Sequence, residues 1–193
     1  MRIIAGTARS RIIQAPAGKD TRPTLDRVRE NLFNILQHRV YHTRVLDLFA
    51  GSGALALEAI SRGASMAVMV DHDRAANVCE QKNTEALHFT DQVRMIHADW
   101  RTATARLIAE GAVFDLIFLD PPYTMNDLTA VTDALKPLLA PDTLLVVEHA
   151  SGKPALVGEG WQLQDTRKYG YVGISFYQYL PAEKMEDSHA GNE

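Results

Sequence analysis

The sequence predicts an α/β fold in which a seven-stranded, mostly parallel sheet is covered by helices. Three observations lead to this prediction. Short apolar runs alternate with helical patterns from residue 44 onward, a glycine-rich stretch follows the first of these runs, and two β-rich runs come after residue 160. A chain of 193 residues is about one domain long and can bury a substantial core.

The composition excludes several classes of protein. Cys79 is the single cysteine, so an internal disulfide framework is excluded. No apolar run approaches the roughly 18 residues that suggest a membrane span, and Met1 is followed at once by Arg2 without an apolar leader. We therefore expect a cytoplasmic protein that does not bind a membrane.

Basic side chains are concentrated at the start of the chain. Residues 1–29 hold seven basic and two acidic side chains, a net charge of +5, whereas the whole chain carries −4. Such a segment on an acidic body indicates an anionic partner, although a solvated basic edge explains the charge equally well. We interpret residues 1–23 as a basic extension, in which a small hairpin could turn near Gly6. Its apolar side chains would be Ile3, Ile4, Ile12 and Ile13.

A helix is expected between this extension and the sheet. Thr24 follows Pro23 and can cap the first turn of the helix. The apolar side chains that follow fall on one face, which should pack on the main domain. They are Leu25, Val28, Leu32 and Ile35.

Five β/α units are expected after this helix. The apolar runs that should form parallel strands are Arg44–Phe49, Ser65–Asp71, Gln92–Ala98, Val113–Asp120 and Thr143–His149. The helical patterns between them are Ala54–Ser61, Arg74–Leu87, Thr102–Ile108 and Leu128–Leu139.

Two β-rich runs complete the predicted sheet. The runs Trp161–Lys168 and Ile174–Leu180 should form an antiparallel hairpin that closes one edge of the sheet. The polar residues 181–193 are interpreted as a disordered tail. The main domain then spans residues 24–180.

The first predicted strand leads into a glycine-rich stretch, Asp47-Leu48-Phe49-Ala50-Gly51-Ser52-Gly53. The glycines let the backbone approach a ligand, and the next helix points its amide end at the same place. Asp71 ends the second strand, where an acid that binds ribose belongs. This pattern favours a nucleoside cofactor and fits NAD as well as any other.

The fourth predicted strand ends in Asp120-Pro121-Pro122-Tyr123. An exocyclic base amine is a poor nucleophile because its lone pair is delocalised into the ring, so catalysis needs acceptors for its N–H groups. The Asp120 carboxylate can accept one, and the rigid Pro121-Pro122 backbone can hold a carbonyl toward the other. Tyr123 can stack on the base. A proline-rich turn with a capping aspartate is the structural alternative.

These motifs together resemble the RsmD family of bacterial 16S rRNA guanine-N2 methyltransferases, within the D/N-P-P-Y amino-methyltransferases. The resemblance covers roughly residues 1–180. The segments that carry it are Arg2-Ile3-Ile4-Ala5-Gly6, Thr21-Arg22-Pro23-Thr24-Leu25-Asp26-Arg27-Val28-Arg29-Glu30-Asn31-Leu32-Phe33-Asn34, Phe49-Ala50-Gly51-Ser52-Gly53-Ala54-Leu55 and Asp120-Pro121-Pro122-Tyr123. Each motif alone is widespread, whereas their order is specific.

The resemblance implies a Rossmann-like methyltransferase fold that uses S-adenosyl-L-methionine to methylate the N2 amine of a guanine in small-subunit (16S) rRNA. Asp47, Gly51 and Gly53 would line the methionine end of the cofactor. Asp71 would hold the ribose hydroxyls, Asp99 and Trp100 would flank the adenine, and Phe49 belongs to the same cofactor-binding set. An acid at position 99 could instead simply cap the next helix.

The substrate side of the resemblance concerns RNA. The catalytic residues would be Asp120, Pro121, Pro122 and Tyr123. The basic extension would grip RNA, either free or in an assembling ribosomal particle, through Arg2, Arg9, Arg11 and Arg22.

Several alternatives stay open at the level of sequence. One alternative is a DNA amino-methyltransferase acting on adenine or cytosine, but a chain of 193 residues leaves no room for a separate target-recognition domain. Another is a noncatalytic RNA-binding assembly factor, which would not need Asp120-Pro121-Pro122-Tyr123. An NAD oxidoreductase ranks last. His38 and His42 have metal-ligand spacing but no identifiable third ligand, so no metal is expected. Glu148 either supports the active site or caps the sheet edge.

Overall fold

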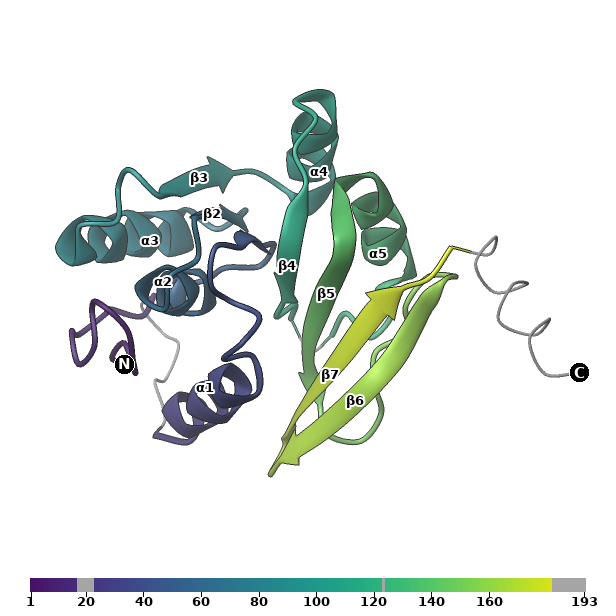
Figure 1. The fold of residues 1–193 in the computed structure, drawn as a ribbon, viewed down its shortest axis with the longest axis horizontal. Coiled ribbons are helices and arrows are strands. Elements are labelled where there is room, and N and C mark those ends of the chain that lie inside the picture. The colour runs from purple at the N-terminus through teal and green to yellow at the C-terminus, as the bar shows by residue number, and fades with distance from the viewer. Residues whose placement is uncertain (17–22, 123, 182–193) are drawn as a thin grey trace, which may run out of the picture.

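The computed structural model describes residues 1–16, 23–122 and 124–181, and it confirms the predicted seven-stranded sheet (Figure 1). The strand order is β3-β2-β1-β4-β5-β7-β6. The strands are β1 Arg44–Asp47, β2 Met66–Asp71, β3 Val93–His97, β4 Phe114–Leu119, β5 Leu139–Ala150, β6 Trp161–Tyr169 and β7 Val172–Tyr179. The helices are α1 Pro23–Ile35, α2 Ala54–Ser61, α3 Arg74–Leu87, α4 Trp100–Ala109 and α5 Thr129–Leu135, with a 3-10 turn at Lys136–Leu138.

The order of the strands determines where a ligand can bind. Strands β1 to β5 pair in parallel, and β7 pairs antiparallel with both β5 and β6, so the predicted hairpin is confirmed. The order reverses between β1 and β4 because the chain runs outward from β1 to β3 and then returns to β4. In open α/β sheets, ligands bind beyond the carboxyl ends of the strands at such a reversal.

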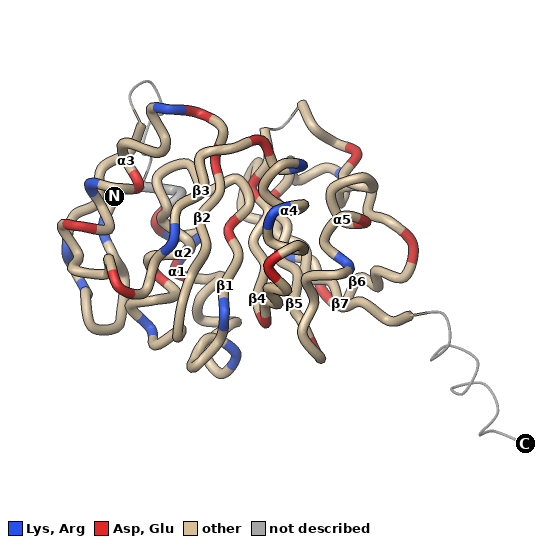
Figure 2. Tube along the Cα trace, turned by 90° about the horizontal axis from the view of Figure 1, so that it is seen from above, with Lys and Arg blue, Asp and Glu red and all other residues tan. Residues whose placement is uncertain are grey.

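Helices lie on both sides of the sheet (Figure 2), and a cluster of buried apolar side chains lies under each layer of helices. On one face, α1, α2 and the N-terminal segment bury Ile3, Phe33 and Leu57 against strand residues such as Phe118. On the other face, α4 and α5 pack against residues of the central strands that point the opposite way, as the alternation of side chains along a strand requires. Within the described residues, no helix is long and apolar enough to cross a membrane.

Helix α1 differs from the prediction in its start and in its buried face. It begins at Pro23, so Thr24 is a helical residue and the predicted capping position was wrong; proline suits a first helical position because it has no N–H to satisfy. Val28 and Leu32 are buried as expected, whereas Ile35 is 44% exposed. Phe33 and Leu36 complete the buried face in its place. The side chain of Leu25 lies outside the described part of the chain.

Residues 1–16 form the expected small hairpin and are packed into the domain. An antiparallel bridge joins Arg2 and Ile12, and the Ile3 amide donates to the Arg11 carbonyl at 2.9 Å. Ile3 and Ile13 are fully buried, whereas Ile12 is 80% exposed. The described part of the basic extension is therefore continuous with the core.

Other boundaries shift for local reasons. Strand β1 ends at Asp47 because Leu48 and Phe49 already belong to the turn that follows it. The fifth helix was predicted to reach Leu139 but ends at Leu135, where a 3-10 turn containing Pro137 precedes an early start of β5. The predicted disordered tail falls almost wholly on residues 182–193, which lie outside the described residues.

Candidate functional site

The loop after β1 is shaped by its glycines. Gly51 and Gly53 both have positive φ angles, +57° and +75°. A Cβ atom at Gly53 would lie 2.6 Å from the sulfur of Met69, so only glycine lets the loop pack this closely against β2. Gly53 then leads directly into α2. The amide end of this helix consequently faces the carboxyl ends of β1 and β4.

Asp71, at the end of β2, holds this loop in place. Its Oδ2 accepts the Gly51 amide at 2.9 Å, and its Oδ1 accepts the Asp73 amide at 2.9 Å. The carboxylate retains further lone pairs, since each oxygen can accept more than one hydrogen bond. Binding of ribose hydroxyls by Asp71 stays a prediction, to which the structure adds a direct link between Asp71 and the glycine loop.

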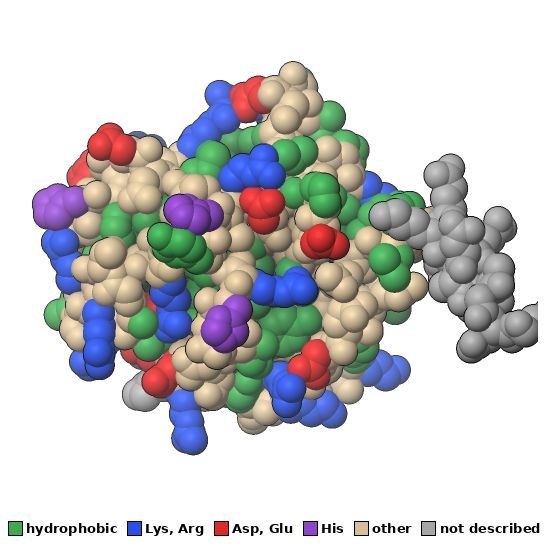
Figure 3. Space-filling view, viewed as in Figure 1, with side chains coloured by type: hydrophobic (Ala, Val, Ile, Leu, Met, Phe, Trp, Pro, Cys, Tyr) green, Lys and Arg blue, Asp and Glu red, His purple; other side chains and the backbone are tan. Residues whose placement is uncertain are grey.

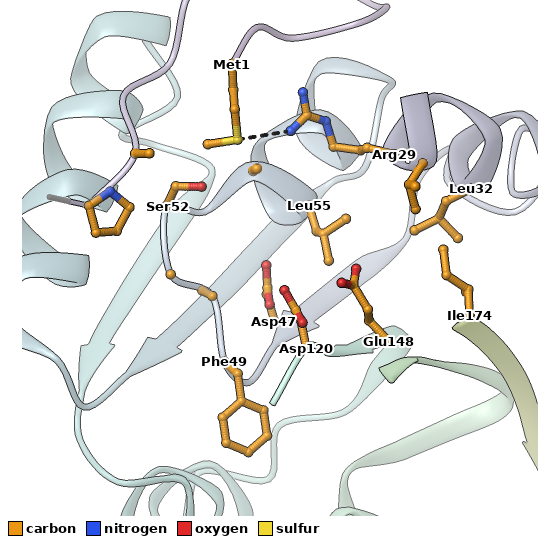
Figure 4. Close-up of a pocket in the computed structure, with 16 residues that line it drawn as sticks. Met1, Arg29, Leu32, Asp47, Phe49, Ser52, Leu55, Asp120, Glu148 and Ile174 are labelled. Atoms are coloured by element: carbon orange, nitrogen blue, oxygen red, sulfur yellow. Dashed lines mark hydrogen bonds between the residues drawn. The ribbon is translucent and has the colours of Figure 1, made fainter. Parts of the chain in front are cut away.

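A cavity opens beside this loop, and three carboxyl groups point toward one another in it (Figure 4). Asp47 comes from the end of β1, Asp120 from the residue after β4, and Glu148 from β5. Leu32 and Ile174 form an apolar part of the wall next to Glu148 (Figure 4). The remaining lining residues are Met1, Ala15, Pro16, Val28, Arg29, Phe49, Ala50, Gly51, Ser52, Ala54 and Leu55.

Asp47 is electrostatically unusual. It is 1% exposed, and burial together with the negative charges of Asp120 and Asp71 raises its pKa to about 8, although the Ala56 amide lowers it somewhat. Within the described residues, neither carboxyl oxygen accepts a hydrogen bond of normal geometry. A buried carboxyl in this state is suited to receive a cation. The ammonium and sulfonium groups of S-adenosyl-L-methionine are such cations, so Asp47 fits the methionine end of that cofactor.

Glu80 is a second buried acid, which was not predicted from the sequence. It lies on α3 with no exposed surface, and burial, followed by the charges of Asp47 and Asp71, raises its pKa to about 8. Three positions later, the Asn83 amide donates to the Ser52 carbonyl of the glycine loop at 2.9 Å. This face of α3 therefore supports the loop. The only signal in the sequence is that Glu80 falls on the same helical face as Ala76 and Leu87.

A second cavity adjoins the first at the carboxyl ends of β4 and β5. It is lined by Pro121, Pro122, Met125 and Asn126, by residues 148–150 and by residues 152–156. Glu148 lines both cavities, and Asp120 in the first is followed directly by Pro121 in the second. The structure therefore brings the predicted catalytic segment to the border between two pockets. Tyr123, predicted to stack on the base, lies outside the described residues.

Asp99 and Trp100 are placed differently from the other predicted cofactor ligands. The Asp99 side chain caps α4 by accepting the Arg101 amide at 2.9 Å, which is the alternative that the sequence offered. Trp100 is 8% exposed, and the Arg101 guanidinium lies 4.3 Å from the centre of its ring. Neither residue lines the cavity that holds Asp47 and Asp120. Contact of these two residues with an adenine stays a prediction.

The predicted RNA-binding arginines are at the surface where the structure describes them. Arg2, Arg9 and Arg11 are exposed, and Arg11 donates to the Ala86 carbonyl at the end of α3. Arg22 lies outside the described residues. Figure 3 shows Lys and Arg side chains scattered over the face seen there, without a single basic patch. Among the described residues, no group of three or more His, Cys, Asp or Glu is placed to hold a metal ion.

The N-terminal segment is fastened to α2 by a buried network that the sequence analysis also missed. Glu58, with no exposed surface, accepts the Ile4 and Ala5 amides at 2.7 and 3.1 Å and the Arg62 side chain at 2.7 Å. Arg29 pairs with Asp26 at 3.0 Å and lies in the cavity wall beside Met1 (Figure 4). One wall of the cavity therefore depends on the docking of residues 1–16.

This mostly parallel sheet, with its strand reversal and glycine loop, has the Rossmann-like fold expected of a methyltransferase. A family model described as "Conserved hypothetical protein 95" matches residues 1–178. The chain belongs to this family, which confirms the resemblance to the RsmD methyltransferases.

Individual relatives agree with this assignment. The chain is 36% identical to the putative rRNA methyltransferase YlbH of Bacillus subtilis, over 92% of this chain and 98% of that protein. It is also 36% identical to ribosomal RNA small subunit methyltransferase D of Escherichia coli K12, over 92% and 89% respectively. A solved structure, the putative methyltransferase yhhF from Escherichia coli, superposes with a TM-score of 0.78 at 35% identity, over 93% of this chain and 97% of that one. These comparisons confirm the expected fold and the methyltransferase class, and they support S-adenosyl-L-methionine as the cofactor.

Proposed function

We propose that this protein transfers a methyl group from S-adenosyl-L-methionine to the exocyclic N2 amine of a guanine in small-subunit (16S) rRNA. The observation that carries the proposal is the position of Asp120, which lines the cavity of the buried Asp47 and directly precedes the wall of the second cavity. The names of relatives that share about a third of the sequence, rRNA methyltransferase and ribosomal RNA small subunit methyltransferase D, support the class of substrate.

Asp120 would act on the target amine. The amine nitrogen gains nucleophilic character when its N–H groups donate to acceptors, because its lone pair is then withdrawn less into the ring. The Asp120 carboxylate accepts one N–H, and the backbone held by Pro121 and Pro122 offers a carbonyl for the other. The bound cofactor supplies an electrophilic methyl group on its sulfonium. Tyr123 would stack on the base beside this segment.

The other predicted residues would hold the two substrates. Asp47 would hold the ammonium end of the cofactor, Asp71 would hold its ribose, and Asp99 and Trp100 would flank its adenine. The exposed Arg2, Arg9, Arg11 and Arg22 would contact phosphates of free rRNA or of an assembling ribosomal particle in the cytoplasm. Each phosphate contact releases counterions, so RNA affinity should fall steeply with salt.

Mass mapping of rRNA from cells with and without the gene tests this function. Loss of a single N2-methylguanine from small-subunit RNA is expected in the deletion strain, with recovery by the parent gene and no recovery by an Asp120→Ala variant expressed at the same level. An unchanged pattern of small-subunit methylation in the deletion strain would refute the proposed substrate.

A further inference from the structure

We propose that Glu148 selects guanine by accepting the N1–H group that lies beside the N2 amine, an inference that rests on the function proposed above. The carboxylate belongs to both cavities, lining the first with Asp120 and the second with Pro121 and Pro122. It therefore stands where the acceptor base must meet the methyl donor. In the close-up of the first cavity it points toward Asp120 and Asp47 (Figure 4).

The sheet register explains why Asp120 and Glu148 lie together. Strands β4 and β5 are parallel, and Leu119 is the partner of Val147. The residue that follows this pair is Asp120, directly after β4, on one side and Glu148 on the other, so the two backbones continue side by side near the spacing of adjacent strands, about 5 Å. Two carboxyl groups on neighbouring strands form a pair of acceptors side by side.

This pair of acceptors matches guanine better than the other bases that carry an exocyclic amine. Guanine has its N2 amine directly beside the ring N1–H, so it presents two donors in a row. Adenine and cytosine have a ring nitrogen with a lone pair beside the amine, and that lone pair would face the Glu148 carboxylate. Glu148 is half-buried, and a bound base would cover it; an acceptor that is covered without receiving a donor costs binding free energy, which is how such a site rejects an analogue.

The second cavity gives the rest of the base a place to lie. Pro121, Pro122 and Met125 form an apolar side, and Asn126 and Lys153 add polar groups to the rim. A base that is splayed out of RNA can enter such a pocket and present its Watson–Crick edge to the protein. That edge would then point back toward Asp120 and Glu148.

The strand that carries Glu148 is held firmly in place. His149 is buried, its Nε2 lies 2.8 Å from the Ser175 hydroxyl, and its Nδ1 lies 2.7 Å from the Ala150 carbonyl. A Cβ atom on Gly173 would lie 2.4 Å from the His149 ring, so β7 packs directly on it. Selection between bases needs acceptors whose positions do not adapt, and this packing provides that rigidity.

The test compares two bases in two proteins. The guanine identified by rRNA mapping is replaced by 2-aminopurine, which keeps the amine at position 2 but has a lone pair at N1. Parent and Glu148→Gln proteins are then assayed for methyl transfer to each RNA, free and in a reconstituted small subunit. The ratio of kcat/KM for guanine over 2-aminopurine within one protein cancels any loss of folding or of cofactor affinity.

The expected result follows from the exchange of an acceptor for a donor. The parent should prefer guanine by about tenfold or more, the range for a hydrogen bond to a charged group. In Glu148→Gln the amide can donate to N1 of 2-aminopurine, so the preference should fall by at least about tenfold. Asp47→Asn is the matched control: it should slow transfer to both RNAs and leave the ratio unchanged.

The outcomes separate this inference from the proposed function. If the parent methylates guanine N2 but Glu148→Gln keeps the parental ratio, Glu148 does not read the base and the inference falls alone. A ratio that changes equally in Asp47→Asn would assign the effect to the cofactor side of the cavity and would also overturn it. Failure of the parent to methylate any guanine overturns both the function and the inference.

Discussion

The charge of Asp47 should make cofactor binding dependent on pH. In the free protein its pKa is raised to about 8, first by burial and then by Asp120 and Asp71, so the carboxyl is mostly protonated near neutrality. A cationic cofactor favours the ionised form, so binding must release a proton. Affinity should therefore rise between about pH 6 and about pH 7.5, by up to about tenfold per pH unit. Calorimetry in two buffers of different ionisation enthalpy measures the proton released.

Asp47→Asn provides the comparison for this measurement. The amide cannot release a proton, so cofactor affinity should be weaker and almost independent of pH over the same range. Equal proton release by the parent and by Asp47→Asn would mean that another group titrates.

Asp120 should affect turnover far more than cofactor affinity, because it is proposed to contact the target amine. Asp120→Ala should reduce methyl transfer by about 100-fold or more, the scale of losing a positioned catalytic acceptor. Affinity for S-adenosyl-L-methionine should change far less than turnover, because Asp120 acts on the cofactor only through the effect of its charge on the pKa of Asp47. Single-turnover kinetics and calorimetry on the same preparation measure the two effects, and parental turnover by the variant would show that the active site lies elsewhere.

At the level of elements, the docking of the N-terminal segment on α2 depends on Gly6. Its φ angle is +83°, and a Cβ atom there would lie 1.7 Å from the Ser61 carbonyl oxygen. Gly6→Ala should therefore lower the free energy of unfolding by about 2 kcal/mol or more, and it should also weaken cofactor binding, because Met1 and Pro16 line the cavity. Urea titration and calorimetry measure both.

Gly111→Ala is the matched control for Gly6→Ala. Gly111 also has a positive φ angle, +67°, but a Cβ atom there would meet nothing within 4 Å. In Gly111→Ala the free energy of unfolding should fall by only about 1 kcal/mol, the cost of a left-handed backbone conformation for alanine, and cofactor affinity should not change. If the two variants were equally stable, the close approach to Ser61 would not hold the segment in place.

Helices and strands were predicted correctly where the apolar residues repeat with a clear period. The prediction was less accurate where contacts with distant residues decide which side chains are buried. Apolar runs located the five strands that pair in parallel, since a strand buried on both faces leaves a continuous apolar run, and β-rich composition located the antiparallel pair β6 and β7. The glycine loop and Asp120-Pro121-Pro122 were found because their sequence is specific. Glu80, Glu58 and Arg29 were missed because a charged helical residue normally faces solvent, and nothing local in the sequence says that it is buried. The buried face of α1 differs from the predicted one for the same reason, since contacts with distant strands determine which apolar residues are covered.

For the whole molecule, the buried acids should make stability fall as pH rises. The folded-state pKa of Glu80 is raised to about 8 from a usual 4.5, so between these values the folded protein holds a proton that the unfolded chain has lost. The contribution of the protonated Glu80 to the free energy of unfolding is fully present below about pH 4.5 and is lost as the pH rises through about 8. When the folded state binds one proton more than the unfolded state, the free energy of unfolding changes by about 1.4 kcal/mol per pH unit.

Glu80→Gln should remove part of this dependence. Between about pH 6 and about pH 8 the parent should lose stability through Asp47 and Glu80 together, and the variant should lose about 2 kcal/mol less. Glu85→Gln, on the exposed face of the same helix, should behave as the parent does. Urea titrations at the two pH values measure the difference, and identical slopes for all three proteins would contradict the burial of an ionisable Glu80.

The lining of the cofactor cavity also constrains the order of events when the chain folds. Its residues run from Met1 to Ile174 on β7, so the two sides of one pocket are separated by most of the sequence. Closing so long a loop is slow, and the contacts it brings together form late. We therefore expect that a chain still lacking β7 cannot yet bind the methyl donor. Binding should become possible only when β7 pairs with β5 and brings Ile174 to the cavity.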